Sequence, residues 1–516
     1  MDIAQNLATE LAKDTSVEKA EAMKPGYVNV WLTPDALIDS LKHTEASTKT
    51  LKAKAKAKPV IVEYSQPNIA KPLGIHHLIG TAIGQATANL YRHAGYNVIA
   101  WNYIGDWGTQ FGKLAVAYEK WGKKPVLKHN IDELLELYVR FHNEVEKDAT
   151  LEDQGREAFR KMEKGDKELR AFWTDVVSVT KKSLGGVYKR LQVSFDLDLG
   201  ESFYEDKMQG VIDEGKKKKV LTAGEAGSLI VQFPEAKNMP PYLIVKGDGA
   251  TLYSTRDLAQ MRYRIDEYAP QEILIFTDIA QKLHFEQLIE TCSMLGWELP
   301  AFENVLFGRM RFADKSMSTR KGNILNLEEV LDEAVKRADA IITERGDAIQ
   351  TDDPKDLAEM MGIGSLVYSI VSQNRKLDMV FDWDKMLSFE GNSAPYIQYT
   401  HARAKSVLRK ADAEKVTSGF IPRQAKTLFS QGERLLLRTL LLYPKTLEDA
   451  RATHMPHKLA NFLYQLCQDF NSFYNTDDIV KAEEPQRSLR LQLTGLTADV
   501  LKSGAGLLTL RLPDRM

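Results

Sequence analysis

A short apolar run followed by a helical repeat dominates the first third of the chain. Residues 60–64 are apolar apart from one acid, prolines punctuate the stretch after them, and apolar residues then recur with helical spacing over residues 77–94. A second β-rich run covers residues 97–104. This order of strand, helix and strand predicts a right-handed βαβ crossover in a parallel sheet.

The same alternation returns in the middle of the chain. Short apolar runs at residues 242–245, 274–277 and 305–307 predict three more strands. Helical spacing between them predicts helices over residues 257–268 and 282–295. We expect these elements to supply the second half of a doubly wound, Rossmann-type parallel sheet in an α/β catalytic domain.

Helical periodicity dominates the rest of the chain and suggests the domain boundaries. A helical insertion with one buried face carries the stripe Ile131, Leu134, Leu135, Tyr138 and Phe141. Beyond about residue 385 the clearest stripe is Leu459, Phe462, Leu463, Leu466, Phe470 and Phe473. The chain begins with a weak helical pattern and a strand at residues 25–32. We therefore expect a small N-terminal α+β domain, a catalytic domain with an insertion and a C-terminal all-α bundle, with bounds 1–58, 59–385 (insertion about 113–240) and 386–516.

Composition places the chain among ordinary globular enzymes. Its 516 residues are 43% hydrophobic and 27% charged, so a catalytic domain and accessory domains can each bury a core. No apolar run is long enough to cross a membrane and the first residues do not resemble a signal peptide, so we expect a cytoplasmic protein. Cys292 and Cys467 are too few and too isolated for a disulfide framework or a zinc site, and we expect buried thiols.

Charge gives no general attraction to nucleic acid, because the formal net charge is −2. Any such attraction must be local. The lysine-rich runs at residues 52–58 and 216–219 are candidates, although a solvated linker or helix end is the favoured interpretation of each.

The loop before the first long helix carries the first family resemblance. It ends in Gly74, Ile75, His76 and His77. It resembles the first signature of class I aminoacyl-tRNA synthetases, specifically arginyl-tRNA synthetases, where the sequence His-x-Gly-His precedes the helix. Only the final histidine is kept. The resemblance implies that these four residues bind ATP and that His77 donates to phosphate, whereas a lone histidine here would be a cap or a surface residue.

A second stretch resembles the mobile Lys-Met-Ser-Lys-Ser loop of the same class. Residues 316–323 read Ser-Met-Ser-Thr-Arg-Lys-Gly-Asn, with Thr319 in place of the second lysine. The resemblance implies that Ser318, Thr319 and Arg320 contact ATP, with Arg320 and Lys321 supplying positive charge. Lys71 fits the upstream lysine that is thought to substitute in the family, although alone it would be a solvated loop residue. Gly308 and Met310 resemble the segment beside adenine.

Recognition of arginine requires anions, because its guanidinium is planar and always charged. Glu63 ends the first strand and Asp257 begins a later helix, so a strand-end ion pair and a helix cap are the alternatives. In the family, acids at these two positions hold the guanidinium. The resemblance adds further arginine-binding positions, which are Gln66, Asn68, Tyr253 and Gln281.

The helical part also resembles the family, through residues 391–399, 471–474 and 513–516. The resemblance implies an anticodon-binding domain in which Tyr396 and Tyr399 stack on bases and Met516 lies nearby. Core packing is an equally weighted interpretation of the two tyrosines. Two other segments, residues 105–112 and 200–204, resemble stretches of arginyl-tRNA synthetases as well.

Together these resemblances imply an arginine–tRNA ligase that forms arginyl-adenylate from L-arginine and ATP and transfers the arginyl group to tRNA(Arg). Mg²⁺ would accompany ATP, and tRNA would be needed before activation. We expect a monomer with no membrane partner and no metal-ligand cluster. A class I ligase for another amino acid is one alternative. A weakened, synthetase-like protein that binds tRNA or nucleotide is another, because Gly74 and His76 depart from the signature.

Overall fold

The computed structural model describes residues 1–54, 56–312, 326–413 and 429–516. Its contacts define two compact units. One comprises residues 52–333 and 373–382, and the other comprises residues 1–51, 334–372 and 383–516. The domain boundaries expected from the sequence stay predictions.

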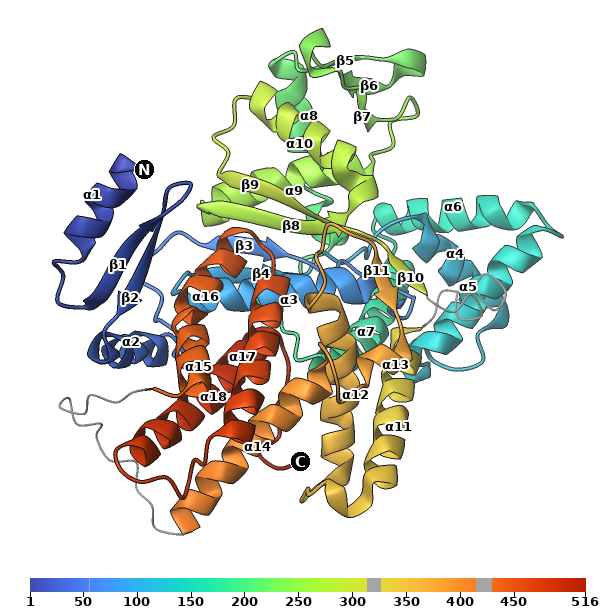
Figure 1. The fold of residues 1–516 in the computed structure, drawn as a ribbon. Coiled ribbons are helices and arrows are strands. Elements are labelled where there is room, and N and C mark those ends of the chain that lie inside the picture. Colours follow the sequence, from blue (N-terminus) through green and yellow to red (C-terminus); the bar gives the residue numbers. More distant parts are fainter. Residues whose placement is uncertain (55, 313–325, 414–428) are drawn as a thin grey trace. The chain divides into compact units, whose positions relative to one another are not determined.

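A parallel sheet forms the centre of the first unit (Figure 1). Its strands are β3 (Val60–Glu63), β4 (Val98–Trp101), β8 (Glu272–Asp278) and β9 (Ala301–Phe307), in the order β4-β3-β8-β9. Every neighbouring pair is parallel. Helix α3 (His77–His93) connects β3 to β4, which confirms the predicted βαβ unit and the α/β class.

Helices cover both faces of this sheet. Figure 1 shows α3 on one face and α9 (Tyr253–Tyr268) and α10 (Lys282–Met294) on the other. The face beneath α9 and α10 forms one hydrophobic core, which includes Ile61, Trp101, Ile273, Ile275, Leu258, Met261 and Leu288. Burial on two faces explains why the central strands β3 and β8 are continuous apolar runs rather than alternating ones.

The strand predicted at residues 242–245 exists, but its predicted place in the parallel sheet is wrong. This strand, β7 (Tyr242–Val245), pairs antiparallel with β6 (Leu229–Val231), and β6 pairs antiparallel with β5 (Leu221–Ala223). The three form a separate small sheet. An apolar run specifies a strand but not its partner, and here strands adjacent along the chain pair with one another.

The predicted insertion is helical over most of its length. It contains α4 (Thr109–Trp121), α5 (Ile131–Val145), α6 (Thr150–Glu163), α7 (Lys167–Arg190) and α8 (Met208–Lys217). The α5 helix begins at a capping box made by Asn130 and Glu133. Its buried face includes Leu137, whereas Leu135 and Tyr138 of the predicted stripe are only partly buried.

The second unit contains the two ends of the chain. Its N-terminal elements are α1 (Asp2–Leu11), β1 (Val17–Met23), β2 (Tyr27–Leu32) and α2 (Pro34–Ala46), of which the sequence analysis missed β1. The C-terminal helices are α14 (Ala394–Ala413), α15 (Gln431–Leu441), α16 (Tyr443–Ala452), α17 (His457–Thr476) and α18 (Gln486–Leu507). All six residues of the predicted α17 stripe are buried, which confirms the helical C-terminal bundle.

The remaining elements lie between these parts of the chain. They are β10 (Met310–Phe312), α11 (Leu327–Arg345), α12 (Pro354–Val371), β11 (Met379–Phe381) and α13 (Trp383–Met386). Strands β10 and β11 form a parallel pair. Cys292 and Cys467 are both buried free thiols, as expected. Across the described ranges, no helix has both the length and the apolar character needed to cross a membrane.

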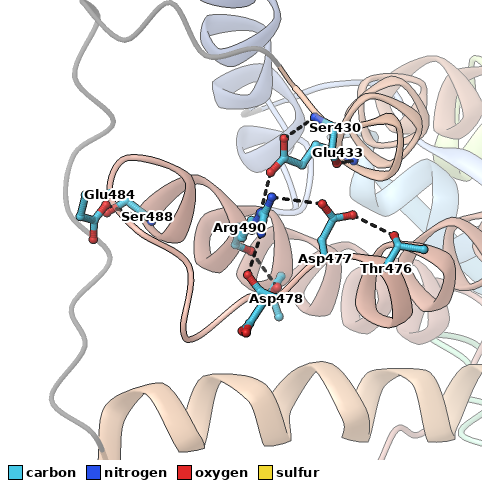
Figure 2. Close-up of polar contacts among 9 residues, drawn as sticks. Ser430, Glu433, Thr476, Asp477, Asp478, Glu484, Ser488 and Arg490 are labelled. Carbon is cyan, nitrogen blue, oxygen red and sulfur yellow. Dashed lines mark hydrogen bonds and ion pairs between the residues drawn. The ribbon is translucent and has the colours of Figure 1, made fainter.

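A buried ionic cluster joins three helices of the C-terminal bundle (Figure 2). Arg490 of α18 donates to Glu433 of α15 at 2.6 Å and pairs with Asp477, just after α17, at 3.1 Å. Its third contact is the Asp478 carbonyl, 2.7 Å away. Glu433 also closes the α15 capping box with Ser430. One guanidinium thus satisfies two buried carboxylates from different helices.

Candidate active site

A cavity of about 430 Å³ opens at the carboxyl-terminal end of β3, where ligands bind in sheets of this kind. All six residues that the sequence analysis assigned to arginine binding line it. They are Glu63, Gln66, Asn68, Tyr253, Asp257 and Gln281. The other lining residues were not assigned to arginine binding, and they are Tyr103, Gly105, Glu201, Gln260, Ala280, His284 and Phe285. The sequence suggested His284 only as a residue beside adenine or as a packed side chain. Residues separated by more than two hundred positions therefore converge on one site.

The loop after β3 has an unusual backbone that shapes the cavity wall. Ser65, Gln66 and Ala70 have φ values of 77°, 53° and 62°, a region that side chains other than glycine rarely adopt. The loop is tied to the end of β4 by a bridge between Asn68 and Gly105. A β-carbon at Gly105 would collide with the Asn68 side chain, so glycine is required there.

Glu63 is both a cavity residue and half of a buried ion pair. Its carboxylate pairs with Arg264 of α9, and the two side chains are 2% and 0% exposed. The Gln66 amide donates to its other oxygen at 2.6 Å. The Arg264 guanidinium lies 4.5 Å from the centre of the Trp101 ring. Glu63 therefore forms the ion pair that was one of its two interpretations, and it also lines the cavity. The Arg264 guanidinium offsets its negative charge.

Asp257 does not cap its helix. Helix α9 begins at Tyr253, and the side chain of Thr255 accepts a hydrogen bond from the Leu252 backbone N–H at 3.1 Å. Asp257 lies a turn further on, and its Oδ2 is 2.6 Å from Nε2 of His284. The helix-cap interpretation is wrong, because the helix starts four residues earlier than the predicted element.

A short polar relay fixes the orientation of Asp257. The Tyr242 hydroxyl lies 3.0 Å from Nδ1 of His284. Burial raises the pKa of Tyr242 well above its ordinary value, so the phenol keeps its proton. A neutral His284 can accept a hydrogen bond from the Tyr242 hydroxyl at Nδ1 and donate one from Nε2 to the Asp257 carboxylate. Tyr253, which is 58% exposed, packs its ring against His284 with centroids 5.0 Å apart.

Glu201 is a cavity acid that sequence reasoning left without a role. It begins a short 3-10 helix (Glu201–Tyr204) and belongs to the segment 200–204 that resembles the family. Burial raises the pKa of its carboxyl to about 7, and the carboxylates of Asp257 and Asp106 add to this while Arg256 opposes it. The family resemblance of this segment was the only feature of the sequence that could have identified Glu201.

The predicted ATP-binding loop ends at the first turn of α3. Gly74 and Ile75 are buried, His76 is exposed, and His77 is the first helical residue. The two imidazole rings lie 4.0 Å apart. Burial and the neighbouring His76 lower the pKa of His77 to about 4. Nδ1 of His77 lies 3.1 Å from the Gly74 N and 3.2 Å from the Gly74 carbonyl oxygen. In the tautomer whose Nδ1 accepts from the Gly74 N–H, Nε2 carries the proton and can donate.

Lys71 is exposed and contacts the helical insertion. Its ammonium lies 5.1 Å from the centre of the Tyr138 ring, a cation–π contact. Tyr138 belongs to α5, so this lysine links the first-signature loop to that helix. Lys71 does not line the cavity that holds the six arginine-binding positions.

Gly308 and Met310 lie at the junction of β9 and β10. The Gly308 N–H donates to the Arg375 carbonyl at 2.8 Å, and a β-carbon here would collide with the Leu377 backbone. Glycine is thus required for the chain's own packing, independently of adenine. Ser318, Thr319, Arg320 and Lys321 lie outside the described residues.

The predicted tRNA-contacting residues lie in the second unit. The Tyr396 hydroxyl accepts from the Asn471 amide at 3.1 Å, and the Arg403 guanidinium lies 4.8 Å from the Tyr399 ring centre. Both tyrosines are partly exposed, so part of each ring is accessible. Met516 packs at the edge of a core that α11 and α12 share.

Comparison with known proteins identifies the family. Residues 40–383, more than half of the chain, match the family of class I (R) tRNA synthetase catalytic domains. Residues 397–516 match the DALR anticodon-binding domain, and residues 1–32 match the arginyl-tRNA synthetase N-terminal domain. The fold is that of a class I tRNA synthetase.

Similarity to curated proteins identifies the family within the class I tRNA synthetases. Proteins from Fusobacterium nucleatum and Clostridium perfringens are each 38% identical over all of this chain and 90% of their own length, and both are named arginine–tRNA ligase. The chain belongs to the arginine–tRNA ligase family. The Thermus thermophilus arginyl-tRNA synthetase structure superposes with a TM-score of 0.83 at 25% identity, covering 100% of this chain and 91% of that one.

Proposed function

We propose that this arginine–tRNA ligase binds L-arginine in the cavity at the end of β3 and activates it with ATP for transfer to tRNA(Arg). The observation that carries the proposal is the convergence of six sequence-assigned residues on one cavity that contains three acids. Glu63 is already paired with Arg264, but a ligase for a neutral amino acid would leave Asp257 and Glu201 without a cationic ligand, which argues against that alternative.

Arginine recognition rests on Asp257 in this proposal. Its carboxylate is held by His284, and a planar guanidinium can form parallel hydrogen bonds with such an oriented acid. Asn68, Gln66 and Gln281 offer amide groups for the rest of the amino acid. Glu63 closes the site while its own charge is offset by Arg264.

Activation requires the carboxylate oxygen of arginine to attack the α-phosphorus of ATP. The bond from that phosphorus to the bridging oxygen of the β-phosphate breaks, and pyrophosphate leaves with its electron pair. The positive end of the α3 dipole and a proton on Nε2 of neutral His77 are suited to phosphate oxygens. We assign further positive charge to Lys71, Arg320 and Lys321.

We assign nucleotide contacts to the ends of the first signature and to the β9–β10 junction. Gly74, Ile75, His76, Gly308 and Met310 would lie beside ATP, as would Ser318 and Thr319. Mg²⁺ would enter with ATP as a substrate complex, neutralising phosphate charge. Within the described ranges, no three His, Cys, Asp or Glu side chains form a metal-holding group.

Transfer would follow when a hydroxyl of the terminal adenosine of tRNA attacks the arginyl carbonyl and AMP leaves. We assign anticodon contacts to the C-terminal bundle, with Tyr396, Tyr399 and Met516 as candidates. The match of residues 397–516 to an anticodon-binding domain supports this assignment. We also propose that the enzyme works as a monomer in the cytoplasm.

Arginine-dependent exchange of pyrophosphate into ATP, with tRNA present, tests the proposal. We expect exchange with arginine and with none of the other nineteen amino acids. Asp257→Asn should raise the KM for arginine by about 10- to 100-fold through loss of a charged hydrogen bond, with little change in the KM for ATP. The matched control is Asp266→Asn on the same helix, which removes only an exposed ion pair with Arg262.

Two results would contradict the proposal. Equal increases in the KM values for arginine and ATP in Asp257→Asn would remove the guanidinium role. Absence of exchange at high enzyme concentration, with tRNA still bound, would favour a synthetase-like binding protein, for which the altered residues Gly74 and His76 are the candidate cause.

A further inference from the structure

Lys71 is held by an aromatic ring rather than by a carboxylate. Its ammonium lies 5.1 Å from the centre of the Tyr138 ring on α5. Among the residues that the structure describes, no aspartate or glutamate forms an ion pair with Lys71. Glu152, the acid that acts electrostatically on Tyr138, is itself paired with Lys113 at 2.8 Å and with Arg156 at 3.7 Å. The charge of Lys71 is therefore left without an anionic partner in the protein.

We propose that Tyr138 is a positioning residue, which holds the Lys71 ammonium in a cation–π contact so that it is ready to bind the ATP phosphates. This inference rests on the proposed role of Lys71 in activation. A carboxylate partner would compete with phosphate for the ammonium, because both are anions that accept charged hydrogen bonds. The face of a ring attracts the cation more weakly and without neutralising it. The ring thus restricts a flexible side chain and leaves its charge available.

The backbone on both sides of Lys71 is fixed, so only its side chain needs a further restraint. The Ala70 N–H donates to the Thr180 hydroxyl at 3.2 Å, and the Leu327 N–H donates to the Leu73 carbonyl at 2.7 Å. The Lys71 side chain is exposed and has a long, flexible stem. Ordering it before ATP arrives lowers the entropic cost of forming the phosphate contact.

Tyr138 is itself held firmly enough to act as a support. Its ring packs against the His142 ring one turn later on α5, with centroids 4.6 Å apart. Leu134 and Phe141 are buried and anchor the same helix. Burial raises the pKa of the Tyr138 hydroxyl, and the Glu152 carboxylate adds to this, so the phenol keeps its proton. The helical insertion thus presents a fixed, neutral ring to the first-signature loop.

The test compares Tyr138→Leu with Tyr138→Phe in arginine-dependent pyrophosphate exchange with saturating tRNA. Leucine removes the ring, whereas phenylalanine keeps the ring and loses only the hydroxyl. We expect Tyr138→Leu to lower kcat/KM for ATP by about 3- to 30-fold, the range of one cation–π contact. The KM for arginine should not change, because neither Lys71 nor Tyr138 lines the arginine cavity. Tyr138→Phe should stay within about twofold of the wild type.

A double-mutant cycle separates positioning from an effect on folding. Lys71→Gln removes the ammonium and should lower kcat/KM for ATP by about 10- to 100-fold. In that background Tyr138→Leu should have no further effect, because no ammonium is left to position. The control is Arg140→Gln, which removes another cation–π contact of α5, with the Trp121 ring at 4.7 Å. Its kcat/KM for ATP should match the wild type.

The contact can also be observed without catalysis. Reductive ¹³C-methylation gives each lysine an NMR signal, and the Lys71 signal is the one that disappears in Lys71→Gln. The Tyr138 ring should shift this signal upfield in the wild type and in Tyr138→Phe, and the shift should be lost in Tyr138→Leu.

Four results would overturn the inference. They are an unchanged kcat/KM for ATP in Tyr138→Leu, a Tyr138→Phe variant as impaired as Tyr138→Leu, an effect of Tyr138→Leu that persists in Lys71→Gln, and a Lys71 signal that Tyr138→Leu does not shift. Failure of the proposed function is distinguishable, because the wild-type enzyme itself would then show no arginine-dependent exchange.

Discussion

Replacing Arg264 with methionine tests how the arginine cavity is held together. The substitution removes a fully buried cation and leaves the Glu63 carboxylate, itself 2% exposed, without its partner. Methionine keeps much of the apolar contact with Trp101, so the main loss is the charge. Breaking a buried ion pair from one side typically costs about 3–5 kcal/mol.

Protonation of Glu63 sets an upper limit on this cost. An unpaired buried carboxylate can take up a proton. Protonating a glutamate whose ordinary pKa is about 4.3 costs about 1.4 kcal/mol for each unit by which the pH exceeds that pKa. The limit is therefore about 4 kcal/mol at pH 7 and about 1 kcal/mol at pH 5. In the variant the folded state binds the extra proton, so the stability lost should grow as pH rises.

Urea denaturation of Arg264→Met at pH 5 and pH 7 measures both values. We expect the loss of unfolding free energy to be about 3 kcal/mol greater at pH 7. The double variant Arg264→Met with Glu63→Gln should recover most of the stability at pH 7, because no buried charge remains. Arg262→Met, which breaks an exposed ion pair with Asp266 on the same helix, should cost no more than about 1 kcal/mol. A loss that is equal at both pH values, or a double variant no more stable than the single one, would refute the reasoning.

Three further substitutions test interactions within the two units. In the C-terminal bundle, Arg490→Met removes the cation that Glu433 and Asp477 share (Figure 2). We expect the free energy of unfolding, measured by urea denaturation, to fall by about 3–5 kcal/mol. A fall below about 1 kcal/mol would show that the cluster is not energetically coupled. In the first unit, Gly84→Ala should lower the free energy of unfolding by about 1–3 kcal/mol, because the new β-carbon would collide with the Tyr64 side chain. Its counterpart is Gly185→Ala in α7, whose β-carbon would meet nothing within 4 Å and which should raise the free energy of unfolding by about 1 kcal/mol. Thermal unfolding of the pair checks this, and shifts of the same sign would contradict it.

The sequence predicted part of the membership of the site but not its internal chemistry. The family resemblance named Glu63, Asp257 and four neighbours, and the structure brings all six to one cavity. It did not indicate that an arginine within the chain already neutralises Glu63. Arg264 is one of many arginines in the sequence, and only its burial against Trp101 distinguishes it.

The helix start near Asp257 shows the same limit at the level of local structure. Apolar spacing indicated a helix from residue 257, whereas α9 begins at Tyr253 because Thr255 completes its capping hydrogen bond. The Thr255 hydroxyl alone does not indicate a helix start in the sequence. Its capping effect depends on the Leu252 backbone N–H, which reaches the hydroxyl only in the folded turn. The alternative interpretation of Asp257 as a helix cap is wrong for this reason.

The sequence by itself determined the class of the fold, the family and the residues that gather at the site. Apolar runs and helical stripes depend on local periodicity, and signature loops depend on residue order, so both can be read without coordinates. Strand partnership and charge balance are different, because they depend on which distant residues become neighbours. Only the tertiary structure placed β7 in a separate antiparallel sheet, paired Glu63 with Arg264, and brought Glu201 into the cavity.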